Sequence, residues 1–388
     1  MHATGVNYYD LLQAAGINPQ NLQAFVDGYF ADKYNTAKWD GFSFDLFPMM
    51  NYTYQQFQQE LKMNVMATYV NPDSPTKSRS TEGFELLSGT IPTMKTQLER
   101  DEKEVRDLMN AQAFQSNNVV KAAISLLHKK VDDMLGSHVN SISYQVNQMK
   151  SLGALTLVDA NNPGGIVNVT FSAQIPTANT TTKTSTAMWW TTSAHTTEGS
   201  AADPIKDMKA QIRALKDVGV IAVVAEMDQL FMEDLLGHSK VLTAIGYNTY
   251  VGSADASAAI NTGTALGDDA RKLVLERIIG CPIIATDHIA TVETWDKPTM
   301  AIVKTQIRSF AADVVVFHPA GPLGVIKHVM PIIPPAGANG AIAQYFNNSL
   351  LMRIHSDINT NVQYFNTTQA VLAVIDKPKY VKRLVVLA

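Results

Sequence analysis

The sequence predicts an α+β protein in which a long helix and paired strands precede a region of alternating helices and strands. Three observations support this prediction. Apolar residues recur at helical spacing over about thirty residues, from Val120 to Met149. Two strands of alternating polarity then flank the turn residues 161–165. From residue 204 onward, helices alternate with apolar strands, which indicates a mixed sheet covered on its faces.

Composition narrows the class of protein. The chain has 388 residues, of which 46% are hydrophobic, so we expect a substantial core and two or more modules. Only 17% are charged, against roughly 25% in typical soluble proteins, as expected for a surface that neighbouring molecules cover. The net charge of −4 disfavours a protein that holds nucleic acid by neutralising phosphates.

Redox and targeting signals are few. Cys281 is the only cysteine, which excludes disulfide frameworks and cysteine-rich zinc sites and fits a reducing cytoplasm. The first twenty residues lack a basic start and an apolar core, so no signal peptide is expected. No apolar run approaches the length of a membrane span. We therefore expect a soluble protein that is made in the cytoplasm.

The first part of the chain combines aromatic residues with a long polar-tipped hairpin. Residues 1–60 contain many aromatics without sustained period, among them Trp39 and Phe42, and form either an irregular core segment or an arm that contacts a partner. Between residues 62 and 95, the runs VMATYV and GFELLSGTI bracket NPDSPTKSRSTE, which has turn chemistry. We therefore expect a hairpin with a polar tip.

Helical signals follow this hairpin. The segment LERDEKEVRDLMNAQAF, which begins at Leu98, places Glu102 four residues before Arg106, a favourable helical charge spacing. The long apolar stripe then predicts a helix of about 45 Å that ends near Gly153. It has no heptad partner in the chain, so the sequence favours the packed backbone of one domain over a coiled coil.

The region after residue 204 is predicted in more detail. Asp203 is a candidate N-cap, and Pro204 occupies the first position of the next helix. Further helices are predicted over 228–237 and 267–280, strands over 220–227, 281–287 and 313–320, and strand-like runs from 362 to 388. The aromatic pair Trp189-Trp190 is expected to belong to a core or an interface.

Motifs for catalysis or ligand binding are absent from the sequence. No phosphate-binding glycine loop, G-x-S-x-G or H-E-x-x-H motif occurs. Asp287-His288 lies at a strand end, where α/β enzymes keep catalytic groups, but adjacent strand residues point to opposite faces. Cys281 precedes a proline beside an apolar strand and is expected to be a buried structural thiol. We therefore predict no catalytic residue, no cofactor and no metal site.

The order of several stretches resembles one family, the lambda-type major capsid proteins of tailed bacteriophages. The stretches that carry the resemblance are ERDEKEVRDL, SISYQVNQMKSLGALTLVD with NVTFSAQIP, AMWWTTSAHTTEGSAADPIKDMKAQI, VVAEMDQLFMEDLLGHSKV and DVVVFHPAGPLGVIKH. The predicted hairpin at 62–95 sits where this family has its extended loop, and with it the resemblance covers roughly residues 60 to 375. Their order and spacing carry the resemblance, because each stretch alone is degenerate.

The resemblance implies the tailed-phage major capsid fold and a set of parts. These are an N-terminal arm (1–60), an extended loop (61–97), a peripheral domain with a spine helix and strand pair (98–203), an axial domain (204–334) and a return to the peripheral domain with C-terminal strands (335–388). The residues expected at contacts between subunits are Lys77, Arg79, Glu82, Trp39 and Phe42. Some relatives cross-link a lysine of the extended loop, but no matching partner motif occurs here, so no cross-link is inferred.

The resemblance also implies a function and partners. Hexamers and pentamers of the chain would form an icosahedral shell, located in the virion and assembled in the host cytoplasm, around double-stranded DNA held by weak non-specific contact. A separate scaffolding protein, a portal and a decoration protein are further expected partners, and no membrane or enzymatic activity is expected. The alternatives are an encapsulin-like bacterial compartment with enzyme cargo, a cytoplasmic α/β enzyme using residues 204–330, and a tail-tube or sheath protein.

Overall fold

The computed structural model describes residues 39, 41–45, 47–59, 84–100, 117–249, 260, 263–296, 301–331, 342–346, 349–357 and 362–387. The chain divides into two compact units, each built from segments that are distant in sequence. Unit 1 takes its residues from 1–54, 90–143 and 325–374, and unit 2 from 55–89, 144–324 and 375–388. The domain boundaries expected from the sequence stay a prediction.

The predicted long helix is confirmed as α4, which spans Asn117–Ser151 and has 35 residues. Its described stripe residues Leu135, Ile142, Val146 and Met149 are almost completely buried, as the apolar spacing predicts. The helix ends just before Gly153, whose φ of +70° is the left-handed conformation that glycine adopts without strain. Residues of α4 up to 143 belong to unit 1 and later ones to unit 2.

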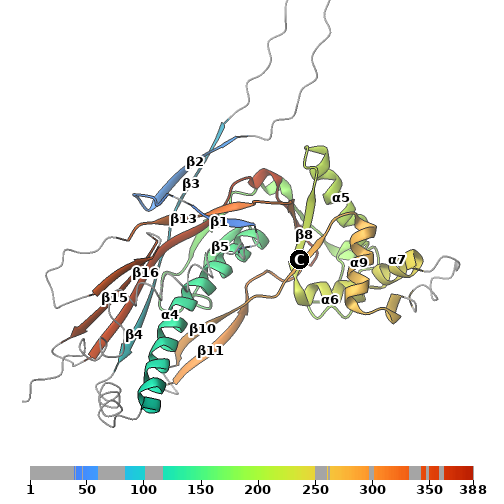
Figure 1. Cartoon of the computed structure of the whole chain (residues 1–388). Coiled ribbons are helices and arrows are strands. Elements are labelled where there is room, and N and C mark those ends of the chain that lie inside the picture. Colours follow the sequence, from blue (N-terminus) through green and yellow to red (C-terminus); the bar gives the residue numbers. More distant parts are fainter. Residues whose placement is uncertain are drawn as a thin grey trace, which may run out of the picture. The chain divides into compact units, whose positions relative to one another are not determined.

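Unit 1 contains a six-stranded sheet with the order β1-β13-β16-β15-β14, to which β4 adds by pairing with β16 (Figure 1). Its strands are β1 (Phe42–Phe44), β4 (Thr93–Arg100), β13 (Gly324–Val329), β14 (Ile342–Phe346), β15 (Leu350–Asp357) and β16 (Val362–Ile375). β15 pairs with residues 362–369 of β16, and β4 pairs with residues 363–370, both antiparallel. β16 is therefore a central strand, and its residues 370–375 are all buried.

Unit 2 contains a five-stranded mixed sheet with the order β7-β17-β12-β8-β9. The strands are β7 (Thr180–Thr182), β8 (Val223–Asp228), β9 (Ile283–Thr286), β12 (Val314–Pro319) and β17 (Lys382–Val385). β8 runs parallel to β9, β17 runs parallel to β7, and β12 is antiparallel to both of its neighbours. The mixed sheet predicted for the region after residue 204 is thus confirmed.

Helices α5 (Pro204–Asp217), α6 (Gln229–Gly237), α7 (Ser239–Thr249) and α9 (Asp268–Ile279) contribute to one core with this sheet. Asp203 caps α5 as predicted, because its carboxylate accepts a hydrogen bond from the backbone N–H of Lys206, and Pro204 opens the helix. The helix then buries Met208, Ile212 and Leu215 on its inner face. Short 3-10 helices lie at Thr177–Asn179, Ser185–Ala187 and Pro378–Tyr380.

Three pairs of strands form separate two-stranded sheets. β5 (Ala154–Leu157) and β6 (Val169–Ser172) form the antiparallel pair predicted around residues 161–165. β2 (Thr53–Gln59) pairs with β3 (Phe84–Thr90), which corresponds to the predicted run GFELLSGTI, whereas the predicted run VMATYV lies outside the described residues. β10 (Ile289–Asp296) and β11 (Ala301–Arg308) are antiparallel and were not predicted.

One predicted element is corrected. The helical segment expected from Leu98 is wrong at its beginning, because Leu98, Glu99 and Arg100 belong to β4 and pair with residues 363–365 of β16. Tertiary pairing with a long central strand here overrides a local helical charge pattern. The rest of that segment, residues 101–116, lies outside the described residues. In the described part of the chain, no helix is long and apolar enough to cross a membrane.

Candidate assembly site

The last turns of α4 are attached to the unit 2 sheet by a buried ion pair. The Lys150 ammonium lies 2.5 Å from Oε1 of Glu226 on β8, and the two side chains are 0% and 1% exposed. Thr286 Oγ1 donates a hydrogen bond of 2.9 Å to the same carboxylate oxygen, and Nε2 of His318 lies 3.4 Å from the other oxygen. Burial alone would raise the pKa of Glu226, but the charges of Lys150 and His318 lower it to about 2.

Further polar contacts attach the same helix end to the segment after β11. Asn147 Nδ2 donates to Ser309 Oγ at 2.7 Å, and Gln148 Nε2 donates to the Ser309 carbonyl at 2.7 Å. Ser151 Oγ accepts from the backbone N–H of Ala311, and the Ser151 carbonyl accepts from Arg383 Nε. Because these groups are hydrogen-bonded while buried, the helix end has a defined position within unit 2.

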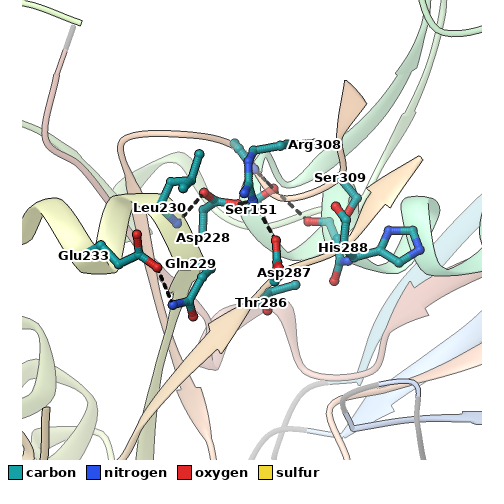
Figure 2. Close-up of polar contacts among 12 residues, drawn as sticks. Ser151, Asp228, Gln229, Leu230, Glu233, Thr286, Asp287, His288, Arg308 and Ser309 are labelled. Atoms are coloured by element: carbon teal, nitrogen blue, oxygen red, sulfur yellow. Dashed lines mark hydrogen bonds and ion pairs between the residues drawn. The ribbon is translucent and has the colours of Figure 1, made fainter. Parts of the chain in front are cut away.

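The base of the β10–β11 hairpin is held by a three-residue charge cluster, shown in Figure 2. Nη1 of Arg308 lies 2.9 Å from Asp228 Oδ1 and 3.1 Å from Asp287 Oδ1. Asp228 also caps α6, since its other oxygen accepts a hydrogen bond from the backbone N–H of Leu230. The arginine therefore joins the ends of β8 and β9 to the first residue pair of the hairpin, Ile289 with Arg308.

The strand-end pair Asp287-His288 does not form a catalytic dyad in this arrangement. The Asp287 carboxylate is paired with Arg308, and the backbone carbonyl of His288 accepts hydrogen bonds from Ser309. Cys281 is a buried free thiol, as predicted, and burial raises its pKa to about 11. Among the described residues, no group of three or more His, Cys, Asp or Glu side chains has a geometry that could hold a metal ion.

A histidine–carboxylate cluster covers the predicted tryptophan pair. Trp189 and Trp190 are 0% and 2% exposed and belong to the unit 2 core. The His195 ring stacks on Trp190 at 4.5 Å, with Nδ1 at 2.6 Å from Asp234 and Nε2 at 2.5 Å from Asp313. Burial alone would lower the pKa of His195, but the hydrogen bonds and charges of the two carboxylates raise it above its usual value.

The described histidine of the long helix is a core group. His138 is buried in unit 1, and its Nε2 lies 2.8 Å from Thr367 Oγ1 on β16. Burial lowers the pKa of His138 to about 4, so its ring is neutral near pH 7.

Exposed apolar side chains identify candidate contact surfaces. In unit 1, Phe47, Met50 and Tyr52 are 76%, 96% and 54% exposed within six residues of chain. In unit 2, the hairpin residues Ile289 and Ile302 are 42% and 58% exposed. Clustered large apolar groups on a surface indicate protein–protein contacts, so the unit 1 segment is a candidate for contacts between subunits. Ile289 and Ile302 do not form such a cluster, because Ile289 pairs with Arg308 at one end of the hairpin and Ile302 pairs with Trp295 near the other.

The residues predicted from the sequence for contacts between subunits are only partly described. Trp39 and Phe42 are each 4% exposed, and Trp39 packs near Phe44 with ring centroids 6.4 Å apart. These two aromatics are therefore buried within their own chain, and a contact with a neighbouring subunit stays a prediction. Lys77, Arg79 and Glu82 lie outside the described residues.

Sequence reasoning missed the ion pair at the end of the long helix and the hairpin. Glu226 is a single carboxylate within an apolar strand, a signal for a buried partner. Nothing in the sequence identifies Lys150 as that partner, because a lysine in the last turn of a helix is ordinary. The hairpin had a usable signal, since two β-rich runs flank Asp296-Lys297-Pro298.

Comparison with known proteins identifies the family. The model for the family described as phage major capsid protein E matches residues 44–363. A search of curated proteins finds no match. Among solved structures, the chain is similar to a phage-related protein from Bordetella bronchiseptica, with 11% identity, a TM-score of 0.47, and coverage of 94% of this chain and 95% of that chain.

Two further solved structures are assembled phage particles. A chain of the satellite phage P4 procapsid has 8% identity and a TM-score of 0.46, covering 94% of this chain and 91% of that chain. A chain of the cyanophage A-1(L) capsid has 12% identity and a TM-score of 0.45, covering 88% and 89%. The assignment rests on the family model, which spans most of the sequence. This chain belongs to the phage major capsid protein E family.

Proposed function

We propose that this major capsid protein assembles into hexamers and pentamers that form a closed icosahedral shell around double-stranded DNA. The observation that carries the proposal is the match of the phage major capsid protein E family over residues 44–363. The low charged fraction of 17% and the exposed side chains of Phe47 and Met50 support it, since both suit a subunit whose surface is covered by neighbours.

The parts of the subunit are proposed to have separate roles in the shell. The N-terminal arm (1–60) and the extended loop (61–97) would contact neighbouring subunits, through Trp39, Phe42, Lys77, Arg79 and Glu82. The peripheral domain (98–203, with the return at 335–388) would form contacts along the spine helix, and the axial domain (204–334) would surround the axis of each capsomer. The buried Lys150–Glu226 pair supports a spine helix with a fixed position in the region that contains the axial strands.

Other partners are proposed on the same basis. A separate scaffolding protein would guide assembly in the host cytoplasm, a portal would occupy one vertex, and a decoration protein would bind the outer surface. We propose that the subunit has no enzymatic activity, which the ion-paired state of Asp287 and the raised pKa of the Cys281 thiol support.

The test is negative-stain electron microscopy of the purified protein, combined with size-exclusion chromatography. Closed shells, rings of five or six subunits or polyheads are expected. A monomer or small oligomer that forms no such particles even with its scaffolding protein would contradict the proposal. The contents of shells purified from infected cells provide the control for the encapsulin-like alternative, because packaged DNA supports a phage head whereas an enzyme cargo contradicts it.

A further inference from the structure

One face of α5 carries a continuous row of cations. They are separated by three, four and three residues, and this spacing places them on a single side of a helix. All of them are exposed, in contrast to the inner face of α5, which is buried against the unit 2 core. We call this set the basic row; its members are Lys206, Lys209, Arg213 and Lys216.

The basic row is not neutralised within the described part of the chain. None of its side chains forms an ion pair with a described carboxylate, whereas Lys183, Arg271 and Lys304 each do. Asp207 on the same helix is bound by Lys183 at 2.5 Å and by Trp189 Nε1 at 3.0 Å. Like charges three and four residues apart repel each other on a helix, and Asp217, four residues after Arg213, offsets this repulsion only at one end of the row.

The dimensions of the row fit a polymer with closely spaced negative charges. At a rise of about 1.5 Å per residue, the first and last cations are about 15 Å apart along the helix axis. One strand of duplex DNA presents a phosphate about every 3.4 Å along its axis. Successive phosphates also turn around that axis, with about 10 per turn, so a straight row of this length faces about two or three of them at once. The length of the row therefore suits contacts with a short stretch of the DNA backbone.

The remaining residues of this face disfavour a protein partner. Its other side chains are the methyl group of Ala210 and the carboxylate of Asp217, both exposed, so no large apolar group lies among the cations. A helix or peptide that docks on a helix face normally requires large apolar anchors. Phosphate contacts need only positive charge and hydrogen-bond donors, and the lysine and arginine side chains of the basic row supply both.

We propose that the basic row binds the sugar-phosphate backbone of double-stranded DNA without reading its sequence. The proposal rests on the proposed function, in which the shell encloses DNA. The DNA contact would then lie on α5 alone, although the chain as a whole has a net charge of −4. Binding is expected to be weak and strongly dependent on salt, because the remaining surface carries excess negative charge.

The test is fluorescence anisotropy of a labelled duplex of about 24 base pairs with the full-length subunit, measured between about 50 and 200 mM salt. Each phosphate contact adds about 0.9 to the slope of log affinity against log salt concentration. The K209Q/R213Q/K216Q variant is therefore expected to reduce that slope by about 2 and to weaken binding equally for unrelated sequences. These side chains are exposed, and circular dichroism checks that the helix content is unchanged.

Two variants serve as controls. Lys304→Gln removes a cation that is 67% exposed on β11, outside the basic row, and is expected to leave the slope unchanged. The K209R/K216R variant keeps the charge and is also expected to bind like the wild type. A triple variant with the wild-type slope would overturn the proposal, as would a wild type that binds no duplex.

A competition experiment tests the choice of DNA over an acidic protein segment. Unlabelled duplex is expected to displace the labelled duplex more effectively than polyglutamate does at the same total concentration of negative charges. More effective displacement by polyglutamate would overturn the assignment to DNA. Electron microscopy of the same variants separates this inference from the proposed function. A triple variant that forms shells but has the reduced slope supports the inference. A wild type that forms no shells even with its scaffolding protein contradicts the proposed function and leaves the slope measurement as the test of this inference.

Discussion

Replacing Lys150 by methionine removes the cation that neutralises the buried carboxylate of Glu226. The two side chains are 0% and 1% exposed, and the two charged atoms lie 2.5 Å apart. At an effective dielectric constant of about 20, unit charges at this distance attract by about 7 kcal/mol. Desolvation offsets several kcal/mol for each ion, so the net contribution of the pair is small. Without Lys150, Glu226 keeps the desolvation cost and loses its attraction to the ammonium, although Thr286 and His318 still contact the carboxylate.

We expect Lys150→Met to lower the free energy of unfolding by about 3–5 kcal/mol. The double variant Lys150→Met/Glu226→Leu is expected to recover part of this loss, because apolar residues of similar volume can replace a buried ion pair at little cost. Recovery is incomplete because Thr286 and His318 lose their carboxylate partner. The measurement is urea unfolding of the full-length, unassembled subunit, followed by circular dichroism.

The exposed pair Lys304–Glu293 provides a matched control, with a distance of 3.0 Å and side chains that are 67% and 56% exposed. Lys304→Met is expected to change the free energy of unfolding by at most about 1 kcal/mol. A Lys150→Met variant as stable as this control would refute the reasoning. A double variant as unstable as the single variant would also refute it, because the cost would then come from lost packing rather than from an unpaired charge.

Three further predictions concern assembly, solubility and pH. Deleting residues 68–84, the tip of the predicted extended loop, is expected to leave a folded, soluble subunit that closes no shells in electron microscopy. Ile142→Asp and Val131→Asp, which place an unpaired charge on the apolar stripe of α4, are expected to cost several kcal/mol each and to yield insoluble protein. The raised pKa of His195 implies stabilisation that is complete below about pH 6.5 and is lost as the pH rises through the folded pKa. The melting temperature of the wild type should therefore exceed that of His195→Gln at about pH 6, and the difference should shrink at alkaline pH.

Normal shells from the deletion variant would show that the extended loop was assigned wrongly. Ile142→Val, which keeps an apolar group, should remain soluble at a cost of about 1 kcal/mol, and soluble, assembling aspartate variants would contradict the buried position of the stripe. Parallel melting curves of the wild type and His195→Gln across pH would show that the imidazolium does not stabilise the fold.

The sequence predicted the elements whose signals are local. The apolar period of α4, the Asp203-Pro204 start of α5 and the turn residues 161–165 each determine a structure within a few residues, and each prediction is confirmed. The segment from Leu98 failed because its conformation depends on β16, which lies far along the chain. A local charge spacing contributes only a few tenths of a kcal/mol, less than the pairing of an eight-residue strand.

The contacts of the candidate site were harder to predict for the same reason. The Lys150–Glu226 pair joins two residues 76 positions apart, and Arg308 contacts a carboxylate 80 positions away. The separate signals, a carboxylate in an apolar strand and a cation at the end of a helix, are present in the sequence. Their pairing follows only from the order of strands in the sheet, which the sequence did not reveal.

The position of β17 inside its sheet has a consequence for the timing of biosynthesis. Residues 382–385 lie between β7 and β12, which are made much earlier. Until residues 382–385 have left the ribosome, the unit 2 sheet lacks an inner strand. The central strand of the unit 1 sheet, β16, is itself made only shortly before them. Pairing between such distant segments is slow because a long chain must first close. A nascent subunit therefore completes the unit 2 sheet only after residues 382–385 have been made, so folding of this unit ends later than synthesis of its other strands.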